Sequence, residues 1–441
     1  MRIFNKNESP LLFLGDIAVF ILSLWLALLL RTGSIPSVTL YQTHFVPFAF
    51  IFFAWVIVFY IAGLYDKHTT VRLKQLPRVV VRAQLANSTL AIAFFYFISY
   101  FGITPKTILF IDLGITIILI ALWRIFGYRL LGLRTKESAI IIGKGEELHQ
   151  IVREVNENPH TAWQFAFVID LDKEQRDLVH VIVEETQKEH VSVIVADFEN
   201  ERVKSALPKL YELLFSGARY ISIDEVYEEI FDRIPTTLVK HEWFLENIAV
   251  AQTSSFFTFF KRFADIVAGL IISIVTLVIL PFVALIIKLE DGGSVFYAQE
   301  RIGKNNRLIR TYKFRSMSEK EKEKITTVGA FLRKTRIDEF PQGWNVLRGE
   351  VSLIGPRPET PTLVSAYEKE IPYYNIRHLV TPGLSGWAQI YQENPPKYGV
   401  DFGNTADKLS YDLYYIKNRS IILDVHIALK TVKDLLSRRG K

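Results

Sequence analysis

The sequence predicts a membrane protein with an N-terminal helical module followed by cytosolic domains. Four apolar runs crowd the first third, strand-like and helical segments alternate in the middle, and charged residues mix with Gly and Pro in the tail. Hydrophobic residues make up 50% of the 441 positions and charged residues 22%. This composition is too apolar for an ordinary soluble protein and too charged for one wholly buried in lipid. It also excludes a largely disordered chain, whose signature is low hydrophobicity.

The residue counts limit the chemistry. The chain has no cysteine, which rules out a disulfide, a thiolate nucleophile and a zinc site with cysteine ligands. Its net charge of +6 suits nucleic acid, anionic lipid or phosphorylated substrates, and the position of the charges must decide among these partners.

The four apolar runs predict a module of four transmembrane helices within residues 1–130. Each run has close to the roughly 20 residues that cross a bilayer core. The runs cover residues 11–30, 45–64, 85–101 and 107–126. Core helices of a large soluble domain are the alternative. Asp16 and Asp112 lie near the ends of two runs, either as functional intramembrane charges or as residues that cap or snorkel at the interface.

Basic residues in the connecting segments predict the orientation. They gather before the first run, between the second and third, and after the fourth, whereas the other two loops contain only Arg31 and Lys106. The clustered residues are Arg2, Lys6, Lys67, Arg72, Lys74, Arg78, Arg82, Arg129, Arg134 and Lys136. The positive-inside rule therefore places both ends of the module, and the chain that follows, in the cytoplasm.

Residues 131–240 read as a Rossmann-like α/β domain. Four segments are typical of strands and are separated by segments typical of helices, an alternation that indicates a parallel sheet. The strand-like segments are SAIIIG, FAFVID, VSVIVADF and YISIDE. Gly143 and Gly145 stand where a dinucleotide-binding turn would place them, but Leu148 replaces the third glycine. Nucleotide binding and a role in assembly or regulation both remain open for this domain.

A fifth apolar segment, at residues 263–288, is long enough to span a membrane. Lys261 and Arg262 precede it and Lys288 ends it, so basic residues flank both sides. Pro281 removes a backbone donor and can kink the helix. We therefore expect a re-entrant helix that enters and leaves on the cytosolic side, with a full crossing as the alternative.

The basic residues of the tail predict phosphate binding. They lie in segments typical of loops, among Gly, Pro and aromatic residues. Guanidinium and ammonium groups in such loops can bind phosphate oxygens. The set is Arg301, Lys313, Arg315, Arg336, Arg357 and Arg377. Nucleic acid is the rival ligand, but no stacking platform or nucleic-acid motif is present. A diphosphate at the membrane surface fits the sequence better.

Asp338 and Glu339 form an adjacent acidic pair in RIDEFPQ. Adjacent carboxylates repel each other unless cations compensate, and Arg336 lies two positions earlier. One carboxylate could attack phosphorus while the other holds Mg²⁺. A pair stabilised by a helix N-terminus is the alternative.

The tail resembles the bacterial sugar transferases, a family of monotopic polyprenyl-phosphate hexose-1-phosphate transferases. The resemblance covers about residues 256–438, through KRFADIVAGL, FYAQERIG, KFRSM, RKTRIDEFPQGWNVLRGEVSLIGPRPE, TPGLSGWAQ and YDLYYIKNRS in this order. It implies an α/β catalytic domain at residues 256–441 with a re-entrant helix at about 263–288. Together with the preceding module and Rossmann-like domain, the chain looks like the long form of the family.

The resemblance also implies a reaction in a bacterial inner membrane. Asp338 would attack the sugar-side phosphate of a UDP-sugar, release UMP and form a phosphosugar-aspartyl enzyme, from which polyprenyl (undecaprenyl) phosphate would take the sugar phosphate. Glu339 would bind Mg²⁺, and Lys313, Arg315, Arg336 and Arg357 would bind phosphates or brace the site. Membrane anchoring is implied for Lys261, Arg262 and Asp265, with Pro281 at the kink. Capsule, exopolysaccharide or O-antigen synthesis would follow.

Two rival functions remain. One is a non-catalytic scaffold of a polysaccharide assembly complex, and the other is an NAD-dependent sugar-nucleotide enzyme acting through the middle domain. The missing third glycine and the lack of a Tyr-x-x-x-Lys pair in that domain disfavour the second. The architecture makes a homodimer plausible, and the sequence does not identify the sugar.

Overall fold

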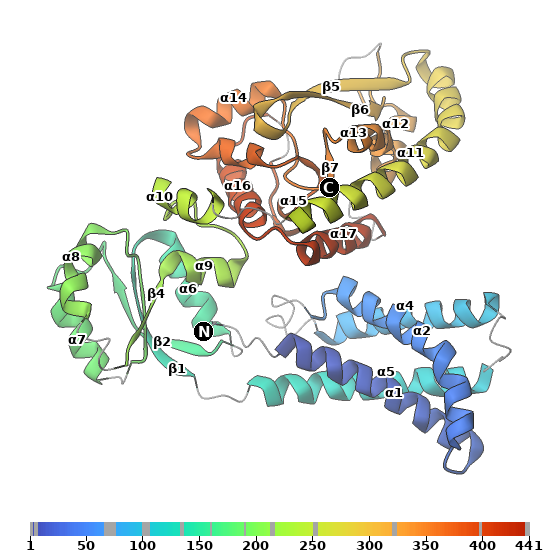
Figure 1. Cartoon of the computed structure of the whole chain (residues 1–441), viewed down its shortest axis with the longest axis horizontal. Coiled ribbons are helices and arrows are strands. Elements are labelled where there is room, and N and C mark those ends of the chain that lie inside the picture. Colours follow the sequence, from blue (N-terminus) through green and yellow to red (C-terminus); the bar gives the residue numbers. More distant parts are fainter. Residues whose placement is uncertain are drawn as a thin grey trace. The chain divides into compact units, whose positions relative to one another are not determined.

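The computed structural model describes residues 3, 8–65, 76–98, 106–132, 136–158, 161–188, 191–211, 217–249, 255–319, 324–396 and 399–436. The chain divides between Val226 and Tyr227 into two compact units, which are described separately (Figure 1). The predicted orientation rests partly on basic residues that lie outside the described residues. These are Arg2, Lys6, Lys67, Arg72, Lys74 and Arg134.

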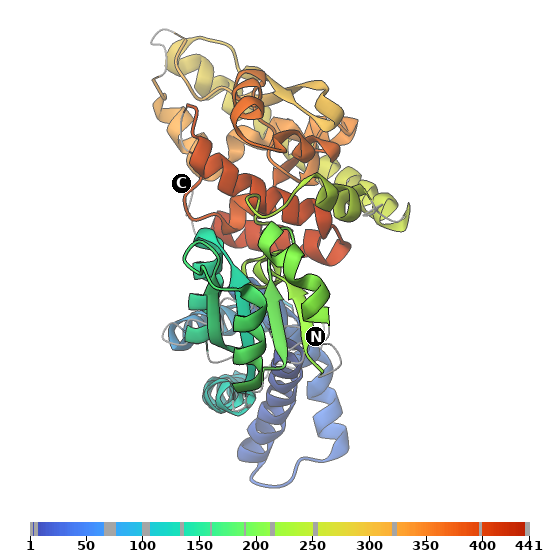
Figure 2. The same ribbon diagram turned by 90° about the vertical axis from the view of Figure 1, so that its left-hand side faces the viewer.

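Four apolar helices begin the first unit, as the sequence predicts. They are α1 (Glu8–Thr32), α2 (Val38–Ala62), α4 (Leu76–Phe97) and α5 (Lys106–Gly132). Figure 2 shows α1 and α2 as two long helices joined by a short connection. Helix α4 starts well before its apolar run and includes Arg78 and Arg82, because helical hydrogen bonding continues beyond the apolar residues. Together with α11 of the second unit, the described residues contain five helices long and apolar enough to cross a membrane.

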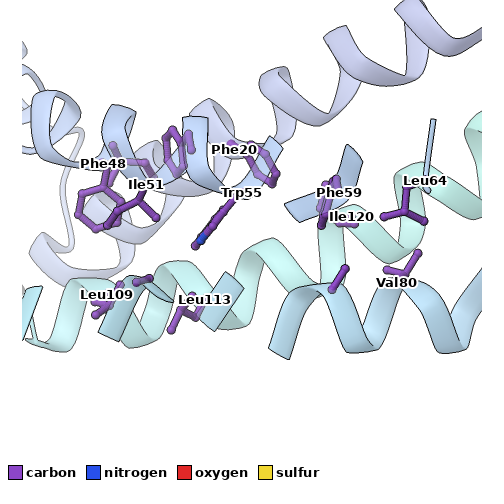
Figure 3. Close-up of a cluster of buried hydrophobic side chains, with 14 of the residues drawn as sticks. Phe20, Phe48, Ile51, Trp55, Phe59, Leu64, Val80, Leu109, Leu113 and Ile120 are labelled. Carbon is purple, nitrogen blue, oxygen red and sulfur yellow. The ribbon is translucent and has the colours of Figure 1, made fainter. Parts of the chain in front are cut away.

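Aliphatic and aromatic side chains together form the core of the four-helix module (Figure 3). The ring centroids of Phe20 and Trp55 lie 5.2 Å apart, and those of Phe20 and Phe52 lie 5.5 Å apart. The indole Nε1 of Trp55 donates a hydrogen bond of 2.9 Å to the carbonyl oxygen of Asn87, which ties α2 to α4. Such aromatic contacts add to the stabilisation from buried area alone.

Two acidic side chains are fully buried in this module and do not reach its surface. Asp16 pairs with Arg124, and the hydroxyl of Tyr65 donates to Asp16 Oδ2 at 2.7 Å. Asp112 accepts a hydrogen bond of 2.7 Å from the Ser23 hydroxyl. Both carboxylates therefore serve as contacts between α1 and α5 rather than as caps at the interface.

The parallel sheet of the first unit confirms the predicted strands. Its order is β2-β1-β3-β4, with β1 (Glu137–Gly143), β2 (Trp163–Asp170), β3 (Val193–Ala196) and β4 (Arg219–Ser222). Figure 1 shows α7 (Leu178–Lys188) and α8 (Glu201–Leu210) on one face and α6 (Gly145–Glu157) and α9 (Ile223–Phe231) on the other. The carbonyl oxygen of Ile3 accepts a hydrogen bond of 2.8 Å from the Ala162 amide, so Ile3 lies against this domain.

The glycine turn after β1 is closely packed at Gly143, and the helix that follows it begins with acidic residues. A Cβ atom at Gly143 would lie 2.6 Å from Cδ1 of Ile223, which already fills the space above the strand. Glu146 and Glu147 occupy the first turn of α6, where a phosphate would need positive charge. Leu148, at the position of the missing third glycine, is buried in the core.

The second unit begins earlier than the sequence suggests. Residues 227–249, partly assigned to the middle domain from sequence, pack with the C-terminal region: Ile234, Val239, Phe244 and Ile248 belong to its core, and the Ile234 amide donates to the Ser410 carbonyl at 3.0 Å. This part includes α10 (His241–Phe244) and the π-helical turn η3 (Leu245–Ala249).

Short elements surround a long helix in the second unit, and its strands form two small sheets. Strands β5 (Phe296–Ile302) and β6 (Leu308–Phe314) are antiparallel, whereas β7 (Ser352–Ile354) and β8 (Gly383–Ser385) are parallel. The helices are α11 (Ser255–Asp291), α12 (Thr327–Thr335), α13 (Gly343–Arg348), α14 (Pro361–Glu370), α15 (Trp387–Tyr391), α16 (Phe402–Lys417) and α17 (Ile421–Leu436), with 3₁₀ turns η4 (Lys304–Asn306), η5 (Ile337–Gln342) and η6 (Tyr374–Leu379).

Helix α11 contacts the rest of its unit along its length. A Cβ atom at Gly343 would approach Ser273 N within 3.2 Å, and one at Gly269 would approach Cγ1 of Val346 within 3.1 Å, so two glycines let α13 lie directly on α11. Near its end, Val283 and Ile287 pack against Phe314 of β6. Large apolar side chains on the remaining surface are exposed, including Phe263, Leu270, Leu277, Phe282 and Leu285.

We expect the buried pair Asp16–Arg124 to be required for the stability of the four-helix module. Arg124→Leu leaves a buried carboxylate without its cation, at a cost of about 3 kcal/mol or more, whereas Asp16→Leu with Arg124→Leu costs less. Thermal unfolding in detergent, followed by tryptophan fluorescence, measures the difference. Arg219→Leu is the matched control, because its pair with Glu137 is partly exposed and contributes at most about 1 kcal/mol. An unchanged midpoint for Arg124→Leu contradicts the prediction.

Candidate active site

A sharp backbone turn presents the acidic pair. Thr326 caps the start of α12 by accepting a hydrogen bond from the Gly329 amide, and the helix ends at Arg336, which adopts the left-handed conformation with φ 59°. The chain then enters η5, whose first turn contains Asp338 and Glu339. A positive φ is strained for a residue with a side chain, and such strain often marks functional sites.

Two cations meet on one oxygen of Glu339. Lys313 Nζ, from β6, lies 2.7 Å from Glu339 Oε1, and Arg357 Nη2 lies 2.6 Å from the same atom. The guanidinium of Arg336 is 4.0 Å from the other oxygen, Oε2. The structure therefore brings together three of the six basic residues predicted to bind phosphate, and they come from three separate segments.

These cations control the ionisation of Glu339. Burial alone would raise the pKa of this carboxyl, but Arg357 and Lys313 outweigh burial and hold the pKa well below its usual range. Burial in turn lowers the pKa of the Lys313 ammonium, although Glu339 opposes this change. Glu339 is thus a permanent anion that keeps two cations at the site.

Asp338 has a different environment. Its side chain is buried, and its Oδ1 atom has no hydrogen-bond partner among the described residues. Burial raises the pKa of this carboxyl and the neighbouring Glu339 raises it further, while Lys313, Arg336 and Arg333 act in the opposite direction. A poorly solvated carboxylate with an uncommitted oxygen, next to cations that can hold phosphate, is suited to nucleophilic attack on phosphorus.

Two other predicted substrate-binding residues are committed to different partners. Arg315 is buried against Asp291 at the end of α11, so it joins that helix to the strand that contains Lys313. Arg301 donates to the Pro358 carbonyl at 3.1 Å and to Gln299 Oε1 at 2.6 Å, and lies 3.8 Å from Glu359. Neither residue contacts the acidic pair.

The predicted anchor residues connect α11 to the second unit. Lys261 Nζ contacts Asp424 Oδ2 at 2.6 Å, and Arg262 donates to the carbonyls of Val346 at 2.8 Å and Leu347 at 2.6 Å. Asp265 accepts from the Leu353 amide at 2.9 Å. Pro281 lies inside α11, which Figure 1 shows changing direction along its course. Anchoring at a membrane surface stays a prediction for these residues.

Backbone contacts hold the loop that contains Arg357. The Gly355 amide donates to the Ser385 carbonyl at 2.8 Å, and the Gly383 amide donates to the Pro356 carbonyl at 2.9 Å. A Cβ atom at Gly383 would lie 2.1 Å from the Gly355 amide nitrogen, so only glycine allows these loops to approach this closely. The TPGLSG segment of residues 381–386 thus supports the GPRP loop that contains Arg357.

The chemistry of Glu339 fits a magnesium ion, which stays a prediction. Among the described residues, no cluster of three His, Asp or Glu side chains could hold a metal alone. However, Glu339 Oε2 accepts no hydrogen bond from the described residues, and Mg²⁺ is commonly held by one or two carboxylates together with phosphates.

Sequence reasoning missed the acidic partners behind the site. Glu359 contacts Lys408, and Asp412 contacts Arg377 at 2.8 Å, so buried charges on α16 support the segments around Arg357. Glu359 was visible as the last letter of GPRPE, but nothing in the sequence joins it to residues about fifty positions later. Glu290, at the end of α11, accepts from the Thr327 amide at 2.7 Å and was likewise missed.

The fold and site define a membrane protein with a buried acidic pair that is held among basic side chains next to an apolar helix. A model of the bacterial sugar transferase family matches residues 256–438. The chain is 30% identical over 345 residues to the UDP-galactose-lipid carrier transferase of Erwinia amylovora, covering 69% of each protein. The chain therefore belongs to the bacterial sugar transferase family.

Two other relatives extend this comparison. The UDP-N-acetylgalactosamine-undecaprenyl-phosphate N-acetylgalactosaminephosphotransferase of Aeromonas hydrophila is 43% identical over 198 residues, which are 42% of this chain and 46% of that relative. The exopolysaccharide production protein PSS of Rhizobium leguminosarum bv. phaseoli is 38% identical over 193 residues, or 40% of this chain and 96% of that relative. The matched region alone therefore accounts for nearly all of one family member.

Proposed function

We propose that the protein transfers a hexose-1-phosphate from a UDP-sugar to polyprenyl (undecaprenyl) phosphate through an aspartyl intermediate. The observation that carries this proposal is the buried Asp338 beside Glu339 and the cations Lys313 and Arg357. Among the described residues, one oxygen of Asp338 has no hydrogen-bond partner. The names of the relatives support the substrate classes, since they include a UDP-sugar and undecaprenyl phosphate. They differ in the sugar, so the donor sugar is left to experiment.

In the first step, an oxygen of the Asp338 carboxylate attacks the sugar-side phosphorus of the donor. The bond from this phosphorus to the bridging oxygen breaks, and UMP leaves with that oxygen and its electron pair. Lys313, Arg336 and Arg357 bind the diphosphate oxygens and stabilise the charge that moves to the leaving group. The product is a mixed anhydride between Asp338 and the sugar phosphate.

In the second step, a phosphate oxygen of the lipid attacks the same phosphorus. The Asp338 carboxylate leaves with its electron pair, which restores the enzyme and produces a polyprenyl-diphospho-sugar. A covalent intermediate allows a water-soluble donor and a lipid acceptor to use the same site in turn. The lipid product would begin the assembly of an exopolysaccharide, capsule or O-antigen.

Glu339 would hold the Mg²⁺ ion, which when bound would neutralise charge on the donor diphosphate. Glu339 keeps its negative charge because Lys313 and Arg357 hold its pKa low. It also keeps these two cations in place before the substrate arrives.

We further propose that the catalytic domain, residues 256–441, faces the cytoplasm of a bacterial inner membrane, with α11 re-entrant. Arg262, near the start of α11, and Asp291, at its end, both contact the rest of the second unit. In a helix that crosses the membrane, one of these two ends would lie on the opposite side from that unit. A helix of 37 residues is about 55 Å long, well beyond the roughly 30 Å hydrocarbon core. The contact between Ile3 and Ala162 supports an even number of crossings before the α/β domain.

Asp338→Asn should abolish release of UMP by protein in nanodiscs supplied with Mg²⁺, polyprenyl phosphate and a panel of UDP-sugars. The amide cannot attack phosphorus, so we expect a loss of at least about a thousandfold. Chromatography distinguishes UMP from UDP. Removing Mg²⁺ with a chelator should also stop release, and adding it back should restore release.

Glu319→Gln is the matched control, because this exposed carboxylate contacts Ser294 and Arg315 rather than the acidic pair. Release of UDP instead of UMP would contradict the aspartyl mechanism. Absence of both products with every donor would favour a non-catalytic scaffold.

The acid limb of the pH–activity profile should lie above the usual range of an aspartate. Asp338 attacks as the deprotonated form, so activity is present above its raised pKa and disappears as the pH falls through that value. Arg333→Gln removes a cation that lowers this pKa, so the limb should move to higher pH. The exposed neighbour Lys334→Gln is the control, which should leave the limb unchanged. A shift to lower pH for Arg333→Gln would show that another group controls the limb.

Single cysteines can test the path of α11, because the chain has none of its own. Ser255→Cys and Lys288→Cys place one thiol at each exposed end of the helix. For a re-entrant helix, a membrane-impermeant maleimide should label both in inverted vesicles and neither in intact spheroplasts. Labelling from opposite sides would show that the helix crosses the membrane.

A further inference from the structure

Arg377 is a buried cation of the second unit that does not reach the acidic pair. Its side chain is only 2% exposed, so a substrate phosphate could not contact it. Its Nη2 donates a hydrogen bond of 2.9 Å to the backbone carbonyl of Arg357 and lies 2.8 Å from Asp412 Oδ2. Its Nη1 donates to the Tyr374 hydroxyl at 2.5 Å. Arg377 therefore contacts the same residue whose guanidinium meets Glu339.

A charged network holds both sides of the Arg357 loop. Glu359, two residues after Arg357, contacts Lys408, and it lies 3.8 Å from Arg301 and 3.9 Å from Arg377. The Ile302 amide donates to the Glu359 backbone carbonyl at 2.9 Å. The loop is thus fixed at the carbonyl of Arg357 by Arg377, and at Glu359 by cations from β5 and α16.

The network matters because a long arginine side chain is flexible. Arg357 is partly exposed, with 30% of its side-chain surface accessible, and without a fixed backbone its guanidinium could leave the pocket. Fixing the backbone removes freedom that would otherwise be lost when a phosphate binds, and this pre-organisation increases affinity. The buried charges have partners within the network, so it does not need a ligand to be stable.

We infer that Arg377 is a positioning residue: through the backbone of Arg357 it aims that guanidinium at the diphosphate-binding side of the acidic pair. The inference rests on the proposed function in one respect, namely that the anion is the diphosphate of the donor. It corrects the expectation from sequence that Arg377 contacts phosphate itself.

Calorimetric binding of inorganic diphosphate to the full chain in nanodiscs tests the inference without turnover. Arg377→Met should weaken the affinity by about tenfold or more, and Arg357→Gln should weaken it by a similar factor. With Arg357→Gln already present, Arg377→Met should change the affinity by less than about twofold, because the group that it positions is gone. Equal losses in both backgrounds would overturn the inference.

Two further variants separate positioning from folding. Arg233→Met removes another cation that pairs with α16, through Asp407, without touching the Arg357 loop. It should lower the unfolding temperature and leave diphosphate affinity unchanged; an equal loss of affinity would overturn the inference. Tyr374→Phe removes only the hydroxyl that accepts a hydrogen bond from Arg377. It should weaken the affinity for diphosphate by about threefold, again only when Arg357 is present.

The outcomes also separate this inference from the proposed function. Coupled losses of diphosphate affinity in a protein that releases no UMP would support positioning and refute the transferase reaction. UMP release with independent losses would refute positioning and support the reaction. Failure of the unaltered protein to bind diphosphate would overturn the inference, because Arg357 would then have no anion to meet.

Discussion

The buried carboxylate of Glu339, bound by Lys313 and Arg357, is the interaction on which the catalytic unit depends. It joins β6, the turn after α12 and the loop before α14 at one oxygen atom. Each cation would repel the other without this anion, and the anion would be costly to bury without the cations. The same arrangement leaves Asp338, one residue away, with an oxygen that has no hydrogen-bond partner in the described part of the chain. Glu339 thus holds the site together. Its cations lower its own pKa, whereas burial and the charge of Glu339 raise the pKa of Asp338.

The sequence predicted the elements that have a local signal. Apolar runs located the long helices, and β-branched segments such as SAIIIG located the strands of a parallel sheet. The acidic pair and its cations were identified by residue type and by resemblance to a family. Sequence could not separate Lys313 from Arg315, because residues two apart share one face of a continuing strand. The strand ends at Phe314, and Arg315 turns instead to Asp291.

The buried network behind Arg357 shows why the remaining contacts could not be predicted. Arg377 and Arg357 look alike in sequence, since both stand among Gly, Pro and aromatic residues. What separates them is burial, and burial of a charge depends on partners that lie far along the chain, such as Asp412. The close approach of Gly343 to α11 has the same origin, because a glycine's neighbours are decided by packing rather than by its own preference. Long-range contacts of this kind leave no periodic pattern.

The contact between Ile3 and Ala162 has a consequence for biosynthesis. Ile3 is synthesised before the four apolar helices, whereas Ala162, whose amide binds its carbonyl oxygen, is synthesised only after them. Ile3 therefore lacks this partner while the helices enter the membrane. This contact can form only after the helices have been made, and it requires Ile3 to lie on the side of the membrane where the sheet folds. A helix inserted in the wrong direction would separate Ile3 from Ala162 by a bilayer, so the contact would form only in correctly inserted chains.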